Sequence, residues 1–210
     1  MCYNILIKKG GLSLFYKFIT KVFNIIIKMR YKVEIIGEEN IPLEGGCIIA
    51  PNHKSNWDAL IIAGLINKRK LSALAKKELF RNPFIKTMLS KLSVIPVDRE
   101  KPELSTIKSV LKILKNKETI VIFPEGTRHK DLDSFAEAKA GIGMFALKSK
   151  CPIIPVSIVT DYKIFSKLTL VIGQPMYFDE LYGKKNDTED YEKVSQDVMN
   201  KIEDNYLSKK

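Results

Sequence analysis

The sequence has few of the residues that build disulfide or metal sites. It has three cysteines in 210 residues, and Cys2, Cys47 and Cys151 lie far apart. An odd number at such spacings predicts neither a disulfide framework nor a cysteine metal site, and it suits a reducing compartment. The two histidines do not stand at the close spacing of common zinc motifs. We therefore expect no bound metal and no cofactor.

The sequence also lacks a long apolar run and any segment of biased composition. No uninterrupted stretch reaches the ~18 apolar residues that a membrane-spanning helix needs. Lys8 and Lys9 are not followed by an apolar core with a small-residue cleavage site, so we expect no signal peptide. With 45% hydrophobic residues and no repeat or linker, the chain is expected to form one domain.

Acidic residues are missing from the N-terminal segment. Residues 1–33 hold seven basic side chains and no Asp or Glu. Over 12–29, polar residues at helical spacing form one stripe, and the opposite side carries apolar residues. The polar stripe comprises Lys17, Lys21, Asn24 and Lys28, and the apolar side Phe15, Phe18, Ile19, Val22, Phe23, Ile26 and Ile27.

This pattern predicts that residues 1–30 form an amphipathic helix on an anionic membrane surface. The alternative is a helix packed on its own domain, with its lysines merely solvated. Under the first interpretation, the protein works at the cytoplasmic face of the cell membrane, as a peripheral or monotopic protein. Residues 31–210 are then expected to form the main domain.

The rest of the chain alternates between short apolar runs and helical patterns, which predicts an α/β fold. We expect a single domain with a mostly buried mixed sheet flanked by helices. The expected strands are Val33–Gly37, Cys47–Pro51, Leu71–Ala75, Val94–Val97, Thr119–Phe123, Ile153–Val159 and Thr169–Ile172. The expected helices are Trp57–Ile66, Glu78–Leu89, Glu103–Leu114, Lys139–Lys148 and Thr188–Leu207.

The segment from Asn52 to Asp58 offers a base and a carboxylate where a predicted strand passes into a helix. Ser55 and Asp58 have the spacing of a capping box, which places Asp58 in the first helical turn. In a regular helix His53 and Asp58 would point ~140° apart, so their contact requires the loop to fold back. Asp58 would then orient His53 as a catalytic base. The alternative is an ordinary loop histidine beside a helix cap.

Phe123-Pro124-Glu125-Gly126-Thr127-Arg128 follows another predicted buried strand. Ligands of α/β proteins bind at the carboxyl ends of such strands. Gly126 permits close backbone approach, Thr127 supplies a hydroxyl, and Arg128 offers a fork for phosphate oxygens. We interpret the segment as an anion site, with Glu125 part of it.

Arginine is scarce, since five of the 35 basic residues are Arg. Arg99 ends a predicted strand as Arg128 does, and both are expected to grip one phosphate. Lys77, beyond another strand, is expected to add positive potential to the same cleft. The alternative is that the arginines form surface ion pairs, which contribute only ~0–1 kcal/mol.

Taken together, these segments resemble the glycerolipid acyltransferase family, in particular bacterial 1-acyl-glycerol-3-phosphate acyltransferases. The resemblance covers roughly Tyr31 to Pro175. It rests on four motifs in order: Asn52, His53, Ser55 and Asp58; Asp98 and Arg99; residues 123–128; and Cys151 to Val156. The sequence departs from the family where Ser93 replaces a usual glycine, His129 a usual serine and Ala138 a usual aromatic residue.

The resemblance implies an enzyme that transfers a fatty acyl group to lysophosphatidate and yields phosphatidic acid. His53 would remove the proton of the 2-hydroxyl, and the oxygen would attack the thioester of acyl-CoA or acyl carrier protein. Arg99 and Arg128 would hold the phosphate of the acceptor. The donor type, the chain length and the lysolipid accepted stay open.

Two other functions fit parts of the sequence. A metal hydrolase could use His53, Asp58, Glu125 and His129 as ligands, although zinc sites usually cluster their ligands more tightly. A net charge of +11 would also suit nucleic acid. No nucleic-acid motif stands out, and the basic, apolar N-terminus suits lipid better, so we expect no nucleic-acid partner.

Overall fold

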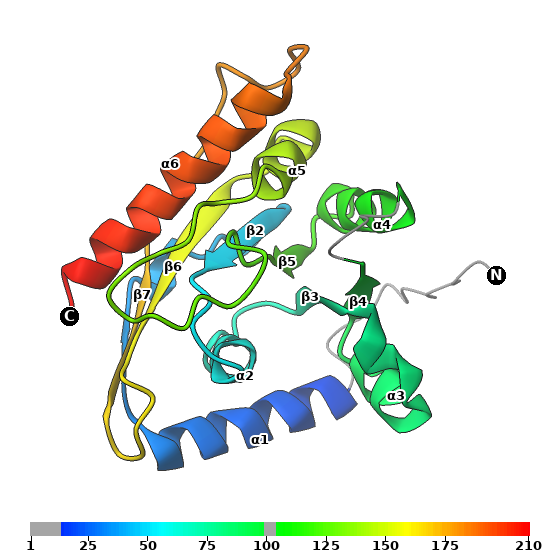
Figure 1. Ribbon diagram of the computed structural model, residues 1–210. Helices are drawn as coiled ribbons and strands as arrows, with labels where there is room; N and C mark the ends of the chain where they lie inside the picture. Colours follow the sequence, from blue (N-terminus) through cyan, green and yellow to red (C-terminus); the bar gives the residue numbers. More distant parts are fainter. Residues whose placement is uncertain (1–13, 99–103) are drawn as a thin grey trace.

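The computed structural model describes residues 14–98 and 104–210, and its helices and strands alternate along the chain (Figure 1). The strands are β1 (Lys32–Ile36), β2 (Cys47–Pro51), β3 (Leu71–Lys76), β4 (Val94–Val97), β5 (Thr119–Val121), β6 (Ile153–Val159) and β7 (Lys167–Ile172). The α-helices are α1 (Leu14–Arg30), α2 (Trp57–Leu65), α3 (Pro83–Lys91), α4 (Leu104–Lys115), α5 (Gly141–Ser149) and α6 (Thr188–Leu207). Two short 3₁₀ helices are η1 (Glu38–Asn40) and η2 (Lys77–Arg81).

The strands form one mixed sheet in the order β1-β7-β6-β2-β5-β3-β4. All neighbours are parallel except β6 and β7, which are antiparallel. The carboxyl ends of β2, β3, β4, β5 and β6 therefore lie at the same edge of the sheet. This edge collects the segments that follow these strands, as it does in other α/β proteins.

Two apolar clusters cover the two faces of the sheet. On one face, α4, α5 and α6 pack over residues such as Ile48 and Ile120. On the other, α1 and α2 pack over residues such as Ile49 and Ile154, and Figure 1 shows these layers on opposite sides of the sheet. Every residue of β2 and β6 is buried. A strand covered on both faces reads as a continuous apolar run, which is the pattern these strands have.

Helix α1 packs tightly against α2. Tyr16 and Ile27 of α1 are buried, and the Asn24 side-chain amide donates to the Gly64 carbonyl at 2.8 Å. A Cβ atom at Gly64 would lie 2.9 Å from the backbone of Phe23 and Asn24, so glycine permits this close approach. One face of α1 therefore belongs to the core of the domain.

The opposite face of α1 is exposed and largely apolar. Its exposed side chains include Leu14, Phe18, Ile25, Ile26 and Met29, with Phe18 64% and Met29 71% exposed. Of the apolar residues predicted to share one side, Phe18 and Ile26 are exposed whereas Ile27 is fully buried, so that side is divided between solvent and the core. Helix α1 therefore packs on its own domain with one face and exposes an apolar face to solvent. No helix within 14–98 and 104–210 combines the length and apolar character needed to cross a membrane.

The mixed sheet, the order of its elements and their type agree with the sequence prediction, and several bounds differ. The predicted helix Glu78–Leu89 is divided in two: its first residues belong to η2, and α3 begins only at Pro83, where the Asn82 side chain caps it. β5 ends at Val121, before the predicted Phe123. α5 begins at Gly141, because the Lys139 amide still donates to the Pro124 carbonyl at 2.9 Å.

Candidate active site

His53 lies in the loop between β2 and α2, at the carboxyl edge of the sheet. Its neighbour Asn52 is fully buried, and both the oxygen and the nitrogen of its side-chain amide form hydrogen bonds with the backbone of β6. Its Oδ1 accepts from the Ile158 amide at 2.7 Å, and its Nδ2 donates to the Ile158 carbonyl at 3.3 Å. Asn52 thus continues the β2–β6 pairing with its side chain and fixes where the loop leaves the sheet.

The loop folds back so that His53 and Asp58 are in contact. Nδ1 of His53 lies 3.0 Å from Oδ2 of Asp58, and the two residues are 8% and 0% exposed. The same oxygen accepts from the backbone amides of Lys54 and Ser55, each at 2.7 Å. Nε2 of His53 makes no hydrogen bond within 14–98 and 104–210. The carboxylate therefore organises the loop as well as the ring, and it leaves Nε2 available.

The predicted capping box is half formed. Asp58 accepts from the Ser55 amide, but the Ser55 hydroxyl accepts from the Trp57 amide at 3.3 Å and not from Asp58. The helix begins at Trp57, so Asn56 is the cap residue, and it makes no side-chain cap bond. The Asp58 side chain points into the loop because the His53 ring and the Lys54 and Ser55 amides all bond its Oδ2 atom there.

Phe123 and Glu125 hold His53 from the end of β5. The rings of Phe123 and His53 are stacked, with centroids 4.0 Å apart and an interplanar angle of 24°. Oε1 of Glu125 accepts from the His53 backbone amide at 2.6 Å, and Glu125 is 1% exposed. Burial raises the pKa of the Glu125 carboxyl. Its side chain therefore turns inward, and it supports the loop that carries His53.

The rest of this motif faces solvent beside His53. Gly126 has φ +70°, in the left-handed region that favours glycine. Arg128 is exposed and forms no ion pair in the described part of the chain, so the alternative of a surface ion pair does not hold for this arginine. The adjoining His129 amide donates to the His53 carbonyl at 2.8 Å, which brings Arg128 next to the His53 loop.

Lys77 lies at the same edge, just after β3, and forms an ion pair with Asp98, just after β4. Asp98 also lines the cavity described below. The expectation for Arg99 falls outside the described residues. Ser93, which replaces a family glycine, has φ +60° and so adopts the conformation that glycine favours.

An apolar cavity of about 440 Å³ opens beside these residues. Its apolar lining comes from β3, α4, β5 and α5, and includes Leu74, Ile107, Val121, Ile142, Met144 and Phe145. Its polar lining includes Asp98, Thr127 and Lys139. Phe123 both lines the cavity and stacks on the His53 ring. Cavities of this size and character are typical of small-molecule sites.

Sequence reasoning missed Lys54 and Tyr162. The Lys54 ammonium donates to the Asp131 carbonyl at 2.7 Å and to the Ser134 carbonyl, and it lies 4.0 Å from the Phe135 ring centroid. Burial lowers its pKa. It thereby anchors the segment between β5 and α5 to the His53 loop. Tyr162 donates to Oδ1 of Asp58 at 2.6 Å from a loop 104 residues away, which no local pattern signals.

The residues proposed as metal ligands do not gather in one place. His129 Nε2 lies 2.7 Å from the Ser134 hydroxyl, whereas Glu125 turns to the His53 backbone. Within the described ranges, no three His, Cys, Asp or Glu side chains group as metal ligands would.

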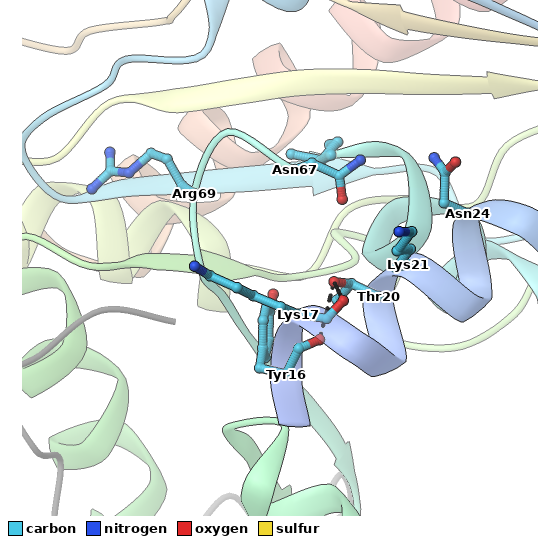
Figure 2. Close-up of a pocket in the computed structure, with 8 residues that line it drawn as sticks. Tyr16, Lys17, Thr20, Lys21, Asn24, Asn67 and Arg69 are labelled. Atoms are coloured by element: carbon cyan, nitrogen blue, oxygen red, sulfur yellow. Dashed lines mark hydrogen bonds between the residues drawn. The ribbon is translucent and has the colours of Figure 1, made fainter. Parts of the chain in front are cut away.

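A second cavity, of about 340 Å³, lies between α1 and the α2–β3 connection (Figure 2). Arg69 lines it, but its guanidinium is bonded to backbone carbonyls, including those of Gly45 at 2.6 Å and Lys117 at 2.7 Å. The exposed Lys17 and Lys21 of α1 line the same cavity. Arg69 therefore ties loops together, and the two lysines supply positive charge along one side of α1.

The chain is similar to known proteins of one family. The sequence model of the family described as Acyltransferase matches residues 32–159, which is more than half of the chain. The 1-acyl-sn-glycerol-3-phosphate acyltransferase of Bacillus subtilis is 35% identical over 168 residues, covering 77% of this chain and 82% of that protein. The protein of the same description from Pseudomonas aeruginosa is 32% identical over 137 residues, which cover 63% of this chain and 51% of that protein.

Among solved structures, the 1-acyl-sn-glycerophosphate acyltransferase of Thermotoga maritima superimposes with a TM-score of 0.69 and 26% sequence identity. The superposition covers 95% of this chain and 80% of that one. The match to the Pseudomonas protein spans about half of that protein's length. From the family match, the Bacillus relative and the shared fold, we conclude that this chain belongs to the acyltransferase family.

Proposed function

We propose that this chain transfers a fatty acyl group from an acyl thioester to the 2-hydroxyl of 1-acyl-sn-glycerol-3-phosphate, which yields phosphatidic acid. The observation that carries the proposal is the buried His53–Asp58 pair beside an apolar cavity and an exposed arginine. A hydroxyl nucleophile needs a base, an acyl chain needs an apolar site, and a phosphate needs a cation.

In this mechanism Nε2 of His53 takes the proton of the acceptor's 2-hydroxyl. The oxygen bonds to the thioester carbonyl carbon, the carbon–sulfur bond breaks, and the leaving thiolate takes the proton back from the His53 imidazolium. Asp58 holds the imidazole through Nδ1 and stabilises the imidazolium that forms. The stacked Phe123 ring restricts the rotation of the imidazole.

The substrates are assigned by chemistry. Arg128, together with Arg99, binds the phosphate of the acceptor, and Gly126 and Thr127 shape that site. The cavity lined by β3, α4, β5 and α5 takes an acyl chain, because its lining is mostly apolar. Lys139, which lines the cavity, adds positive potential at this edge of the sheet, whereas the charge of Lys77 is offset by Asp98. The donor is acyl-CoA or acyl carrier protein.

The exposed apolar face of α1 is proposed to lie on an anionic membrane surface, at the cytoplasmic face of the cell membrane. Two exposed residues of the β6–β7 loop, Ile164 and Phe165, are proposed to join this surface, because the Phe165 amide donates to the Arg30 carbonyl at 2.7 Å and so places the loop at the end of α1. The loop reaches the C-terminal end of α1 in Figure 1. Lys17 and Lys21 flank the apolar face and would meet anionic headgroups.

Flotation with anionic liposomes tests the membrane surface. The double variant Phe18→Ser/Met29→Ser changes exposed residues and leaves the packed face of α1 intact. We expect it to be recovered with liposomes several-fold less than wild type, because two large apolar side chains no longer enter the interface. Leu207→Ser, which removes an exposed leucine from the end of α6, is the matched control. Equal flotation of the three proteins would remove this part of the proposal.

The activity is tested with purified protein by crossing several lysolipid acceptors with both donor types and reading the products by mass spectrometry. We expect phosphatidic acid as the main product, formed from 1-acyl-sn-glycerol-3-phosphate. Faster acylation of a lysolipid without a terminal phosphate would contradict the assigned acceptor.

A further inference from the structure

The β6–β7 loop brings a tyrosine to the one carboxylate oxygen that His53 does not use. Oδ2 of Asp58 accepts from His53, Lys54 and Ser55, whereas Oδ1 accepts from the Tyr162 hydroxyl at 2.6 Å. A short bond from a hydroxyl to a carboxylate is among the stronger hydrogen bonds in proteins. Asp58 is therefore held at both oxygens, and its plane is fixed relative to the imidazole.

The backbone at Tyr162 is unusual. Its φ is +62°, a left-handed conformation that is uncommon for a large side chain. Such conformations persist where surrounding contacts hold them, and they gather at functional sites. Here the Tyr162 amide donates to the Thr160 hydroxyl at 3.3 Å, and the Tyr162 carbonyl accepts from Arg30 at 3.1 Å.

Arg30 connects this loop to α1. Besides the Tyr162 carbonyl, its guanidinium donates to the Tyr31 hydroxyl at 2.9 Å and lies 4.5 Å from the centroid of the Trp57 ring. Trp57 begins α2, one residue before Asp58. The C-terminal end of α1, the β6–β7 loop and the start of α2 are thus joined around the Asp58 carboxylate.

We propose that Tyr162 is a positioning residue for the His53–Asp58 pair, and that Arg30 holds Tyr162 in place from α1. This inference rests on the proposed function of His53 as the base. The Tyr162 hydroxyl orients the carboxylate and competes with the His53 ring for its negative charge. The contacts also join α1, the helix proposed to lie on the membrane, to the pair that performs the chemistry.

Tyr162→Phe tests the inference because it removes the hydroxyl and keeps the ring. Without that donor, more of the charge on Asp58 acts on His53, so the protonated imidazole is favoured. The other charged or titratable groups around His53 stay in place: Lys54 in its own loop, and Glu125 and His129 from the segment after β5. The NMR titration midpoint of the His53 ring should therefore move to higher pH.

The chain has two histidines, so two ring signals are expected, and His129→Gln identifies them. We also expect kcat to fall about three- to tenfold with the acceptor KM unchanged, as for a lost orienting bond. Tyr191→Phe is the matched control. Tyr191 lies on α6, and the substitution removes a hydroxyl that donates to the Asn186 carbonyl at 3.3 Å. That variant should keep the wild-type midpoint and kcat.

Arg30→Gln should move the His53 midpoint in the same direction by a smaller amount, because the loop then loses one of its contacts. If the His53 titration midpoint of Tyr162→Phe equals that of the wild type, the positioning role is overturned. If the midpoint of Arg30→Gln equals that of the wild type, the link to α1 is overturned. The ring titration does not depend on turnover. A wild-type protein without acyl transfer therefore refutes the proposed function, whereas an active wild type with an unmoved midpoint in Tyr162→Phe refutes this inference alone.

Discussion

Asp58→Asn is the perturbation whose effect the structure defines most closely. The carboxylate is fully buried and accepts four hydrogen bonds, three at Oδ2 and one at Oδ1. An asparagine oxygen at the Oδ2 position can still accept from Lys54, Ser55 and the His53 ring. Its amide nitrogen cannot accept from Tyr162, and no negative charge remains to stabilise the imidazolium.

The size of the effect follows from this loss of charge. A hydrogen bond to a charged group contributes about 1.5–3 kcal/mol, and in Asp58→Asn the His53 ring loses its charged acceptor. If the imidazolium in the transition state loses about 2–3 kcal/mol of stabilisation, kcat falls by about 30- to 200-fold. The free energy of unfolding should decrease by a similar amount, because the two loop amides lose a charged acceptor.

The assay combines the rate of phosphatidic acid formation with urea unfolding of the same samples. Asp204→Asn makes the same chemical change at an exposed position of α6 and should leave both quantities unchanged. Turnover of Asp58→Asn within about threefold of wild type would show that the buried charge does not act on the base. A large loss of stability with normal turnover would assign Asp58 to the loop alone.

Three further predictions concern the neighbouring residues. Arg128→Lys keeps the charge but loses the fork, so the acceptor KM should rise about tenfold with kcat little changed, and an unchanged KM would count against phosphate binding. Ser93→Gly relieves a left-handed φ, so thermal unfolding should shift upward by about 1–4 °C, whereas a downward shift would show that the serine is not strained. Burial raises the pKa of Glu125, so its contribution to stability is present below the unfolded value, about 4.3, and is lost as pH rises through the folded value. Glu125→Gln should therefore gain more stability relative to wild type at pH 8 than at pH 5, and a pH-independent difference would contradict this.

Much of the fold is predictable because burial leaves a local pattern. β2 and β6 are covered on both faces, and their apolar runs predict their bounds as observed, Cys47–Pro51 and Ile153–Val159. The bounds of α6 also agree, since Asp187 and Asp190 form a capping box at its start. The predicted start at Glu78 was wrong, because the Pro83 ring and the Asn82 cap begin α3 there, whereas residues 83–89 are helical as predicted.

The candidate site is only partly readable from the sequence. His53 and Asp58 are close in the chain, and their contact could be expected from a loop that folds back. Tyr162 lies in the loop that connects the antiparallel strands β6 and β7, and it contacts Asp58 because this loop lies beside the start of α2. That placement depends on tertiary structure. The inward turn of Glu125 could not be read either, because its partner is a backbone amide.

In the proposed mechanism, His53 acts as the base toward the hydroxyl of a lysolipid acceptor. The kcat of His53→Ala, measured as phosphatidic acid formed from 1-acyl-sn-glycerol-3-phosphate and an acyl thioester, tests this role. We expect kcat to fall by about 10² or more, with folding retained in the circular dichroism spectrum. A variant that turns over within a few-fold of wild type would contradict the claim.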